Sequence, residues 1–94
     1  MNVKKNRSVD FALRTLTPAD RQKALAWLDH LANWENDPQV REASRASNYE
    51  NVLVLTTSDD ISISFSLDTE NSQITVLDIT KPSRFATANH SMQI

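Results

Sequence analysis

The feature that most constrains the fold is a strict alternation of apolar and polar residues between positions 61 and 67. Four apolar side chains alternate there with three serines: Ile61, Ile63, Phe65 and Leu67 with Ser62, Ser64 and Ser66. Successive side chains of a β-strand point to opposite faces, so a period of two predicts a strand with one buried face. The apolar residues are expected to face the core, and the serines to line an open face of the sheet.

Two further strands are predicted on either side of this segment. Val52–Leu55 is a continuous apolar run, as in a strand buried on both faces, and residues 73–80 form the third strand. Short turns at 58–60 and 68–72 join the three strands into an antiparallel meander. The chain contains no glycine, so Asn71 is the residue expected to take a left-handed backbone conformation in the second turn.

The first part of the chain predicts helices instead. Apolar residues recur at helical spacing between Ser8 and Leu16 and again between Ala24 and Trp34. Asn36-Asp37-Pro38 is expected to stop the second helix, because the residue before a proline is pushed out of the α region. Two helices with a tight joint form a helical hairpin.

The start of the second helix has its own sequence signature at residues 17–20. The Thr17 hydroxyl can cap the helix, and Pro18 suits the first helical position, where a missing N–H is not needed. Asp20 lies in the first turn, where the helix dipole favours an acidic side chain.

These elements predict a single α+β domain over residues 1–94, with an N-terminal helical hairpin packed on one face of a small antiparallel sheet of three to four strands. The expected parts follow in chain order: an edge strand and the hairpin in 1–36, a loop with a helical turn at 39–43 in 37–50, the β-meander in 51–81, and a polar tail in 82–94.

Composition excludes several classes of function. With no Cys there is no disulfide framework and no thiolate site, and with no Gly there is no glycine-rich phosphate loop. The basic start is followed by no apolar stretch, so no secretory signal is predicted and a cytoplasmic protein is expected. His30 and His90 have no clustered acidic residues, so we expect neither a metal nor a cofactor.

Charge is unevenly distributed along the chain. Residues 1–47 carry eight Lys/Arg against six acidic residues, whereas residues 48–94 carry two against six, and the net charge is −2. Nucleic-acid binders usually carry a basic footprint. This balance therefore counts against strong, nonspecific binding to a phosphate backbone.

The order of these elements resembles the RelE/ParE superfamily of bacterial toxins. The resemblance rests on a basic start, the segment Val9–Arg21, a long helix ending at Leu31-Ala32-Asn33, and the strand block that follows. Lys81 and Arg84, directly after the last strand, resemble the basic residues found there in the family. The resemblance covers roughly residues 1–86. It implies a small twisted sheet with two helices on one side, a bacterial cytoplasmic location and an antitoxin partner that wraps the toxin.

The resemblance implies two different chemistries. RelE-like members cut messenger RNA on the ribosome without a metal, and ParE-like members poison DNA gyrase. For the first, Lys81 and Arg84 are the candidate catalytic pair, although solvated residues at the end of a sheet are the alternative. The central strand carries Ser62 where nuclease members often carry Arg, which predicts feeble cleavage unless Arg41 or Arg45 reaches over from the loop to bind RNA.

Several residues allow more than one interpretation. The serine row is either a polar groove for a ligand or partner strand, or an ordinary solvated sheet face. Trp27 and Trp34 share roughly one helical face and are either core residues or exposed anchors for a partner, with Trp34 as the candidate partner contact. An antitoxin that adds a strand or lays a helix in a groove would contact either the edge near Val52–Leu55, with Val52 and Val54 as candidate contacts, or the helical pair. The paired acids, Asp59-Asp60 and Asp68/Glu70, are turn residues or weak cation ligands.

Three functional hypotheses follow. The first is the toxin of a toxin–antitoxin module with weak or absent messenger-cleaving capacity; if it is an enzyme, it is a metal-independent, ribosome-dependent endoribonuclease. The second is a non-catalytic protein-binding module on the toxin fold. The third is an unrelated α+β interaction protein. The sequence does not choose between ribosome and gyrase as the target, name the antitoxin, or decide whether the chain forms a homodimer.

Overall fold

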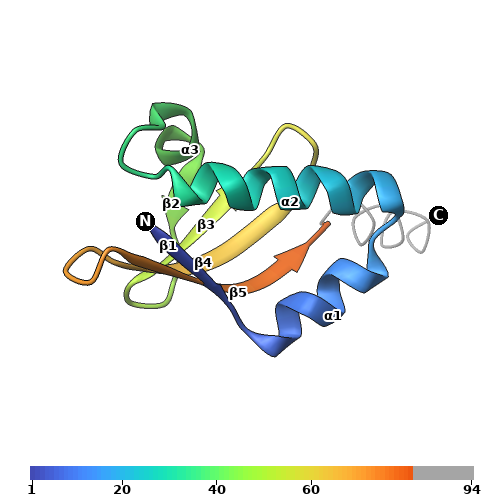
Figure 1. Cartoon of the computed structure of the whole chain (residues 1–94), viewed down its shortest axis with the longest axis horizontal. Helices are drawn as coiled ribbons and strands as arrows, with labels where there is room; N and C mark the ends of the chain where they lie inside the picture. Colours follow the sequence, from blue (N-terminus) through green and yellow to red (C-terminus); the bar gives the residue numbers. More distant parts are fainter. Residues whose placement is uncertain (82–94) are drawn as a thin grey trace.

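The structure is a computed structural model that describes residues 1–81. Three helices lie against a five-stranded sheet with the strand order β1-β5-β4-β3-β2 (Figure 1). The elements are β1 (Asn2–Lys5), α1 (Arg7–Thr15), α2 (Pro18–Ala32), α3 (Pro38–Glu42), β2 (Ser44–Ala46), β3 (Val52–Thr56), β4 (Ser62–Asp68) and β5 (Gln73–Thr80).

The α+β class and the meander of β3, β4 and β5 are confirmed, but the predicted antiparallel sheet of three to four strands is wrong. The sheet has five strands and is mixed, because β1 pairs with β5 in parallel. The direction of an edge strand depends on the connections between elements, which the local pattern does not encode. The fifth strand, β2, lies in the segment predicted as loop. Its residues Ser-Arg-Ala have no alternation, and only pairing with β3 extends them.

The predicted helices form, with one shifted boundary. In α1 the buried residues are Val9, Ala12 and Leu13, and Thr17 caps α2 by accepting a hydrogen bond from the Asp20 backbone N–H at 3.2 Å. The second helix ends at Ala32, before the stop predicted at 36–38, and turns fill residues 33–36. The predicted helical turn is α3, which begins at the proline.

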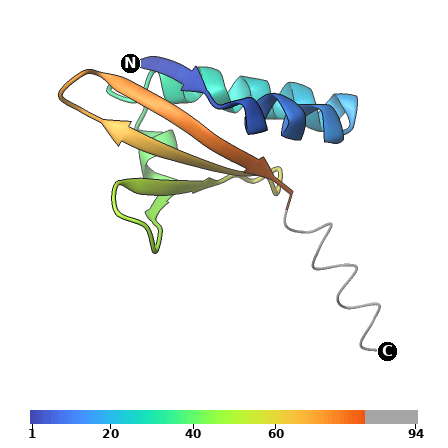
Figure 2. The same ribbon diagram turned by 90° about the horizontal axis from the view of Figure 1, so that it is seen from below.

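Both long helices lie on one side of the sheet and leave the other side uncovered (Figure 2). The alternation in β4 is confirmed: Ile63 and Phe65 are fully buried beneath the helices, whereas the three serines are half-buried on the open face. The ring of Trp34 contacts Phe65 edge-on, with 5.7 Å between centroids. The largest fully buried side chains of this core are Phe65, Leu31, Leu55, Ile61, Ile63, Ile74, Val9, Val40 and Val76.

Two local predictions are wrong. In β3 only Leu55 is buried, and Val52 and Val54 are half-buried, because they face the side of the sheet opposite α1 and α2. The left-handed residue in the β4–β5 turn is Ser72 (φ 50°) and not Asn71. Asn71 instead donates to the Asp68 carboxylate from its backbone N–H (3.2 Å) and its side-chain amide (2.8 Å), which moves the left-handed position one residue on.

A β-bulge interrupts the β4–β5 ladder at Leu77. Ser64 is registered with Asp78 and Phe65 with Val76, so Leu77 is an extra residue in β5. The Ser8 hydroxyl of α1 donates to the Leu77 carbonyl at 2.9 Å. Since a bulged residue leaves the ladder, this bond satisfies a carbonyl that the neighbouring strand does not.

Candidate functional site

The candidate site is the open face of the sheet, where the serines of β4 form the central row. On the β3 side, Ser62, Ser64 and Ser66 are registered with Thr56, Val54 and Val52. On the β5 side, the same serines are registered with Thr80, Asp78 and Thr75. Every strand neighbour of the row is therefore neutral or acidic, and none is cationic.

A hollow of about 440 Å³ lies on this face beside the loop that joins β2 to β3. The bulged Leu77 and the two valines form its apolar part, and Ser64 contributes a hydroxyl. The Tyr49 side chain at its margin is 76% exposed. The full lining is Ser47, Asn48, Tyr49, Val52, Val54, Ser64 and Leu77, none of which is charged. The sequence reasoning did not identify Tyr49 or Leu77, because a bulge and a loop tip leave no periodic pattern.

Lys81 does not join this face. Its Nζ lies 2.7 Å from Asp20 Oδ2 at the start of α2, which is on the helix side of the sheet. The Asp20 side chain is 10% exposed and that of Lys81 is 28% exposed. The Lys81 hydrogen bond, more than any other contact, holds the pKa of Asp20 below its ordinary value. The sequence indicated Asp20 only as a first-turn acid and did not reveal this partner.

The loop arginines also have partners near them. Arg41 Nη1 donates to the Glu35 carbonyl at 2.9 Å and to the Trp34 carbonyl at 3.3 Å, just after α2. Arg45 Nη1 donates to the carbonyls of Glu42 and Ser44, at the end of α3. Arg45 is registered with Val54 and so belongs to the edge of the open face, but its guanidinium is bonded to the α3 end. Neither arginine converges on the serines.

The remaining predicted site residues are separated from one another. Arg84 lies outside the described residues, as does His90. The expectation of a sheet edge at Val52 and Val54 is wrong, because β2 pairs with β3 on the side away from β4. Both valines line the hollow on the open face, whereas Trp34 packs against the core on the helix side. The three residues suggested as partner contacts therefore lie on opposite faces of the sheet. A partner that touches all of them has to pass around an edge.

Trp27 and the acidic turns have structural partners. Trp27 Nε1 donates to Asp59 Oδ2 at 3.2 Å, and Lys23 Nζ lies 3.6 Å from the other oxygen of that carboxylate. These contacts tie the β3–β4 turn to α2. They support the interpretation of Trp27 as a residue packed at the margin of the core.

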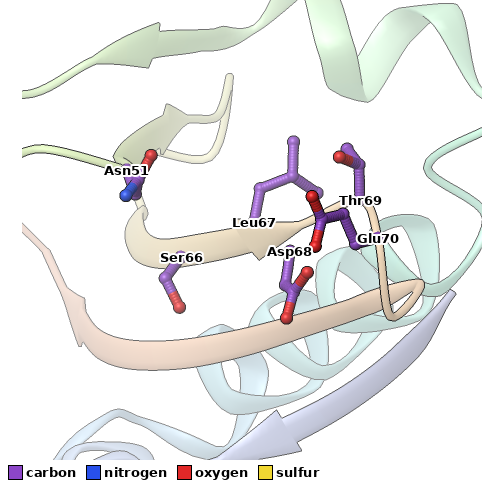
Figure 3. A pocket seen from close by; sticks show the side chains of 6 residues that line it. All are labelled: Asn51, Ser66, Leu67, Asp68, Thr69 and Glu70. Carbon is purple, nitrogen blue, oxygen red and sulfur yellow. The ribbon is translucent and has the colours of Figure 1, made fainter.

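The second acidic turn borders a polar hollow of about 450 Å³ at the β4–β5 turn (Figure 3). Ser66 and Asp68 point to one side of β4 and Leu67 to the other. The Asp68 carboxylate already accepts two bonds from Asn71, which lower its pKa. Within residues 1–81 no group of three or more His, Cys, Asp or Glu side chains is placed to hold a metal ion. In the same part of the chain, no helix combines the length and the apolar character that crossing a bilayer requires.

Comparison with solved structures finds close matches in fold at low sequence identity. The RelBE2 toxin–antitoxin complex of Mycobacterium tuberculosis matches with a TM-score of 0.69 and 11% identity, over 85% of this chain and 95% of that chain. The isolated RelE toxin of E. coli matches with a TM-score of 0.65 and 12% identity, over 85% and 82%. The archaeal RelE–RelB complex of Pyrococcus horikoshii matches with a TM-score of 0.60 and 22% identity, over 85% and 92%.

No protein-family model and no curated protein sequence matches the chain. The likeness therefore lies in three-dimensional structure. It extends over most of the described residues and over most of each matched chain. The chain therefore has the fold of the RelE structures.

Proposed function

We propose that this protein is the toxin component of a toxin–antitoxin module and that its capacity to cleave messenger RNA is weak or absent. The RelE fold supports the first part, because one matched structure is a toxin–antitoxin complex and another is an isolated RelE toxin. The proposed location is the bacterial cytoplasm, and the proposed partner is a cognate antitoxin. The target is the ribosome with its messenger, or DNA gyrase.

The observation that carries the second part is the serine row and its neutral or acidic neighbours. Cleavage through the 2′-hydroxyl requires a base, an acid for the leaving oxygen and fixed positive charge for the phosphorane. Each missing preorganised donor typically lowers the rate by about 10²–10³. Within residues 1–81, the serine row and its registered neighbours lack the positive charge that this transition state needs.

The toxin assignment is tested by expression in a bacterial host. Induction of the wild-type chain is expected to arrest growth, and co-expression of the antitoxin from the neighbouring reading frame is expected to restore it. Normal growth at verified expression of folded protein would overturn the assignment.

The weak-cleavage assignment is tested by adding charge to the central strand. Purified wild type is expected to cleave ribosome-bound messenger slowly or not at all, and Ser62→Arg is expected to raise cleavage. Ser66→Arg is the matched control, because it adds the same charge to the same face at the other end of β4. Rapid cleavage by the wild type would refute the proposal, and equal gains from both variants would refute the role given to position 62.

A non-catalytic protein-binding module is the second candidate, and the hollow favours it. Its lining is uncharged and includes two valines and a leucine, which suits a protein side chain better than a phosphate. Val52→Glu and Val54→Glu are expected to weaken antitoxin binding if the partner docks there. Trp34→Ala tests the same partner on the other face of the sheet.

A further inference from the structure

The end of β5 directs Lys81 away from the open face. Ile79 is registered with Ile63 and is buried, and Thr80 is registered with Ser62 on the open face. Lys81 comes next, and its ammonium contacts Asp20 of α2. Strand alternation and the observed contact agree that this side chain lies on the helix side.

Asp20 is built into its position from two directions. Its backbone N–H is held by the Thr17 hydroxyl in the N-cap of α2, which fixes the first turn. Its side chain is nine-tenths buried and has Lys81 as its ion-pair partner at 2.7 Å. Separating this ion pair is unfavourable, because it would leave the buried carboxylate without a cationic partner.

The pair also joins distant parts of the chain. It connects the residue after the last strand to the first turn of the long helix, 61 positions away in sequence. An ammonium fixed here contributes little net charge to the surface. An RNA phosphate competing for it has to displace a buried carboxylate.

We propose that Asp20 is a positioning residue that holds the Lys81 ammonium on the helix side of the sheet and cancels its charge, so that Lys81 is withheld from RNA phosphate. The inference rests on the proposed function, since it names the residue that withholds a candidate cation from cleavage. Replacing the carboxylate by a neutral group releases Lys81 to bind phosphate.

The test measures the affinity of purified protein for a short, fluorescein-labelled single-stranded RNA by anisotropy at several salt concentrations. Asp20→Asn is expected to bind several-fold more tightly than wild type at low salt. The slope of log affinity against log salt is expected to steepen by about 0.7, the value for one additional phosphate contact on a single strand.

Three variants separate positioning from other effects. Asp29→Asn makes the same charge change at an exposed position on the same helix and is expected to give a smaller gain. The double variant Asp20→Asn/Lys81→Gln is expected to lose the gain of Asp20→Asn. Asp20→Glu keeps a carboxylate and is expected to stay near wild-type affinity. Circular dichroism of each variant verifies that it is folded.

No increase in Asp20→Asn, or an equal increase in Asp29→Asn, overturns the inference. Amine labelling of the wild type, quantified by mass spectrometry, provides a second measurement that needs no variant. Lys81 is expected to react more slowly than the exposed Lys4. Addition of RNA is expected to leave the reactivity of Lys81 unchanged. Protection of Lys81 by RNA would overturn the inference even if Asp20→Asn did not fold. The growth assay remains a separate test, because it reports toxicity and not phosphate contact.

Discussion

At the scale of single residues, arginine takes over a task that glycine usually performs. Many helices end in a left-handed glycine that helps to satisfy the last free carbonyls, but this chain has no glycine. The residues that end its helices have negative φ, and guanidinium groups bond the carbonyls instead. Arg21 serves the end of α1 and Arg45 the end of α3, whereas Arg41 bonds carbonyls in the turn that follows α2. Half-buried or exposed, these cations are used within the fold.

Arg21→Ala is expected to destabilise the protein by about 1–2 kcal/mol, because it removes charge-assisted bonds to carbonyls at the end of α1. Arg21 Nε donates to the Leu13 carbonyl at 2.9 Å, and Nη2 donates to the carbonyls of Arg14 and Leu16. Urea unfolding measures the change. Arg14→Ala is the control at an exposed position and should change stability by less than about 0.5 kcal/mol; equal effects would contradict the capping role.

Acid is expected to weaken the fold through Asp20. The Lys81 hydrogen bond places the pKa of this carboxyl below its ordinary value of 3.8, so ionised Asp20 stabilises the native state above about pH 4. That stability is lost as the pH falls through the lowered pKa of the folded state. The urea midpoint of wild type should therefore fall more steeply from about pH 5 to pH 2 than that of Asp20→Asn. Parallel pH profiles would contradict this.

At the scale of elements, the local sequence pattern predicts those features of the fold that depend on neighbouring residues. The alternation of β4, the Thr17 cap and the proline at the start of α2 are all readable from neighbouring residues, and the structure confirms them. The strand β2 and the direction of β1 depend on pairing with distant segments, so no local pattern could predict them. The apolar run of β3 predicts burial on both faces, but one of its faces is open, because the sequence does not show which face of a strand the helices cover.

Removing the α2 cap tests the element that positions Asp20. Thr17→Ala is expected to cost about 1 kcal/mol of folding free energy, since the Asp20 N–H loses its acceptor. Thr17→Ser keeps the hydroxyl and should stay close to wild type. Thermal or urea unfolding of wild type and the two variants measures these changes. If Thr17→Ser lost as much stability as Thr17→Ala, the effect would belong to the methyl group and not to the cap.

At the scale of the whole molecule, the sheet divides a buried half from an exposed one. The candidate site was predictable as a face, because the serines had to lie opposite the core. Which charged side chains reach this face was not predictable. The contacts of Lys81, Arg41 and Arg45 depend on where the helices end relative to the strands. These contacts leave the open face with hydroxyl, apolar and acidic groups at its centre.

The two halves should respond very differently to truncation. Phe65→Ala is expected to destabilise the protein by about 3–5 kcal/mol, because it opens a cavity in the core and removes the edge-on contact with Trp34. Ser64→Ala, one position away on the open face, should change stability by less than about 0.5 kcal/mol. Chemical unfolding of both variants tests this; similar losses would show that the open face is also a packing surface.

Because residues 2–5 pair with residues 73–76, β1 has no hydrogen-bond partner in the sheet until β5 has been translated. Pairing between segments so distant in sequence is slow to form, and parallel pairing especially so. A nascent chain stopped before β5 exposes the unpaired edges of both β1 and β4. The surface on which the proposed toxicity depends is therefore completed only after β5 has emerged, which leaves the proposed antitoxin an interval in which to bind the nascent chain.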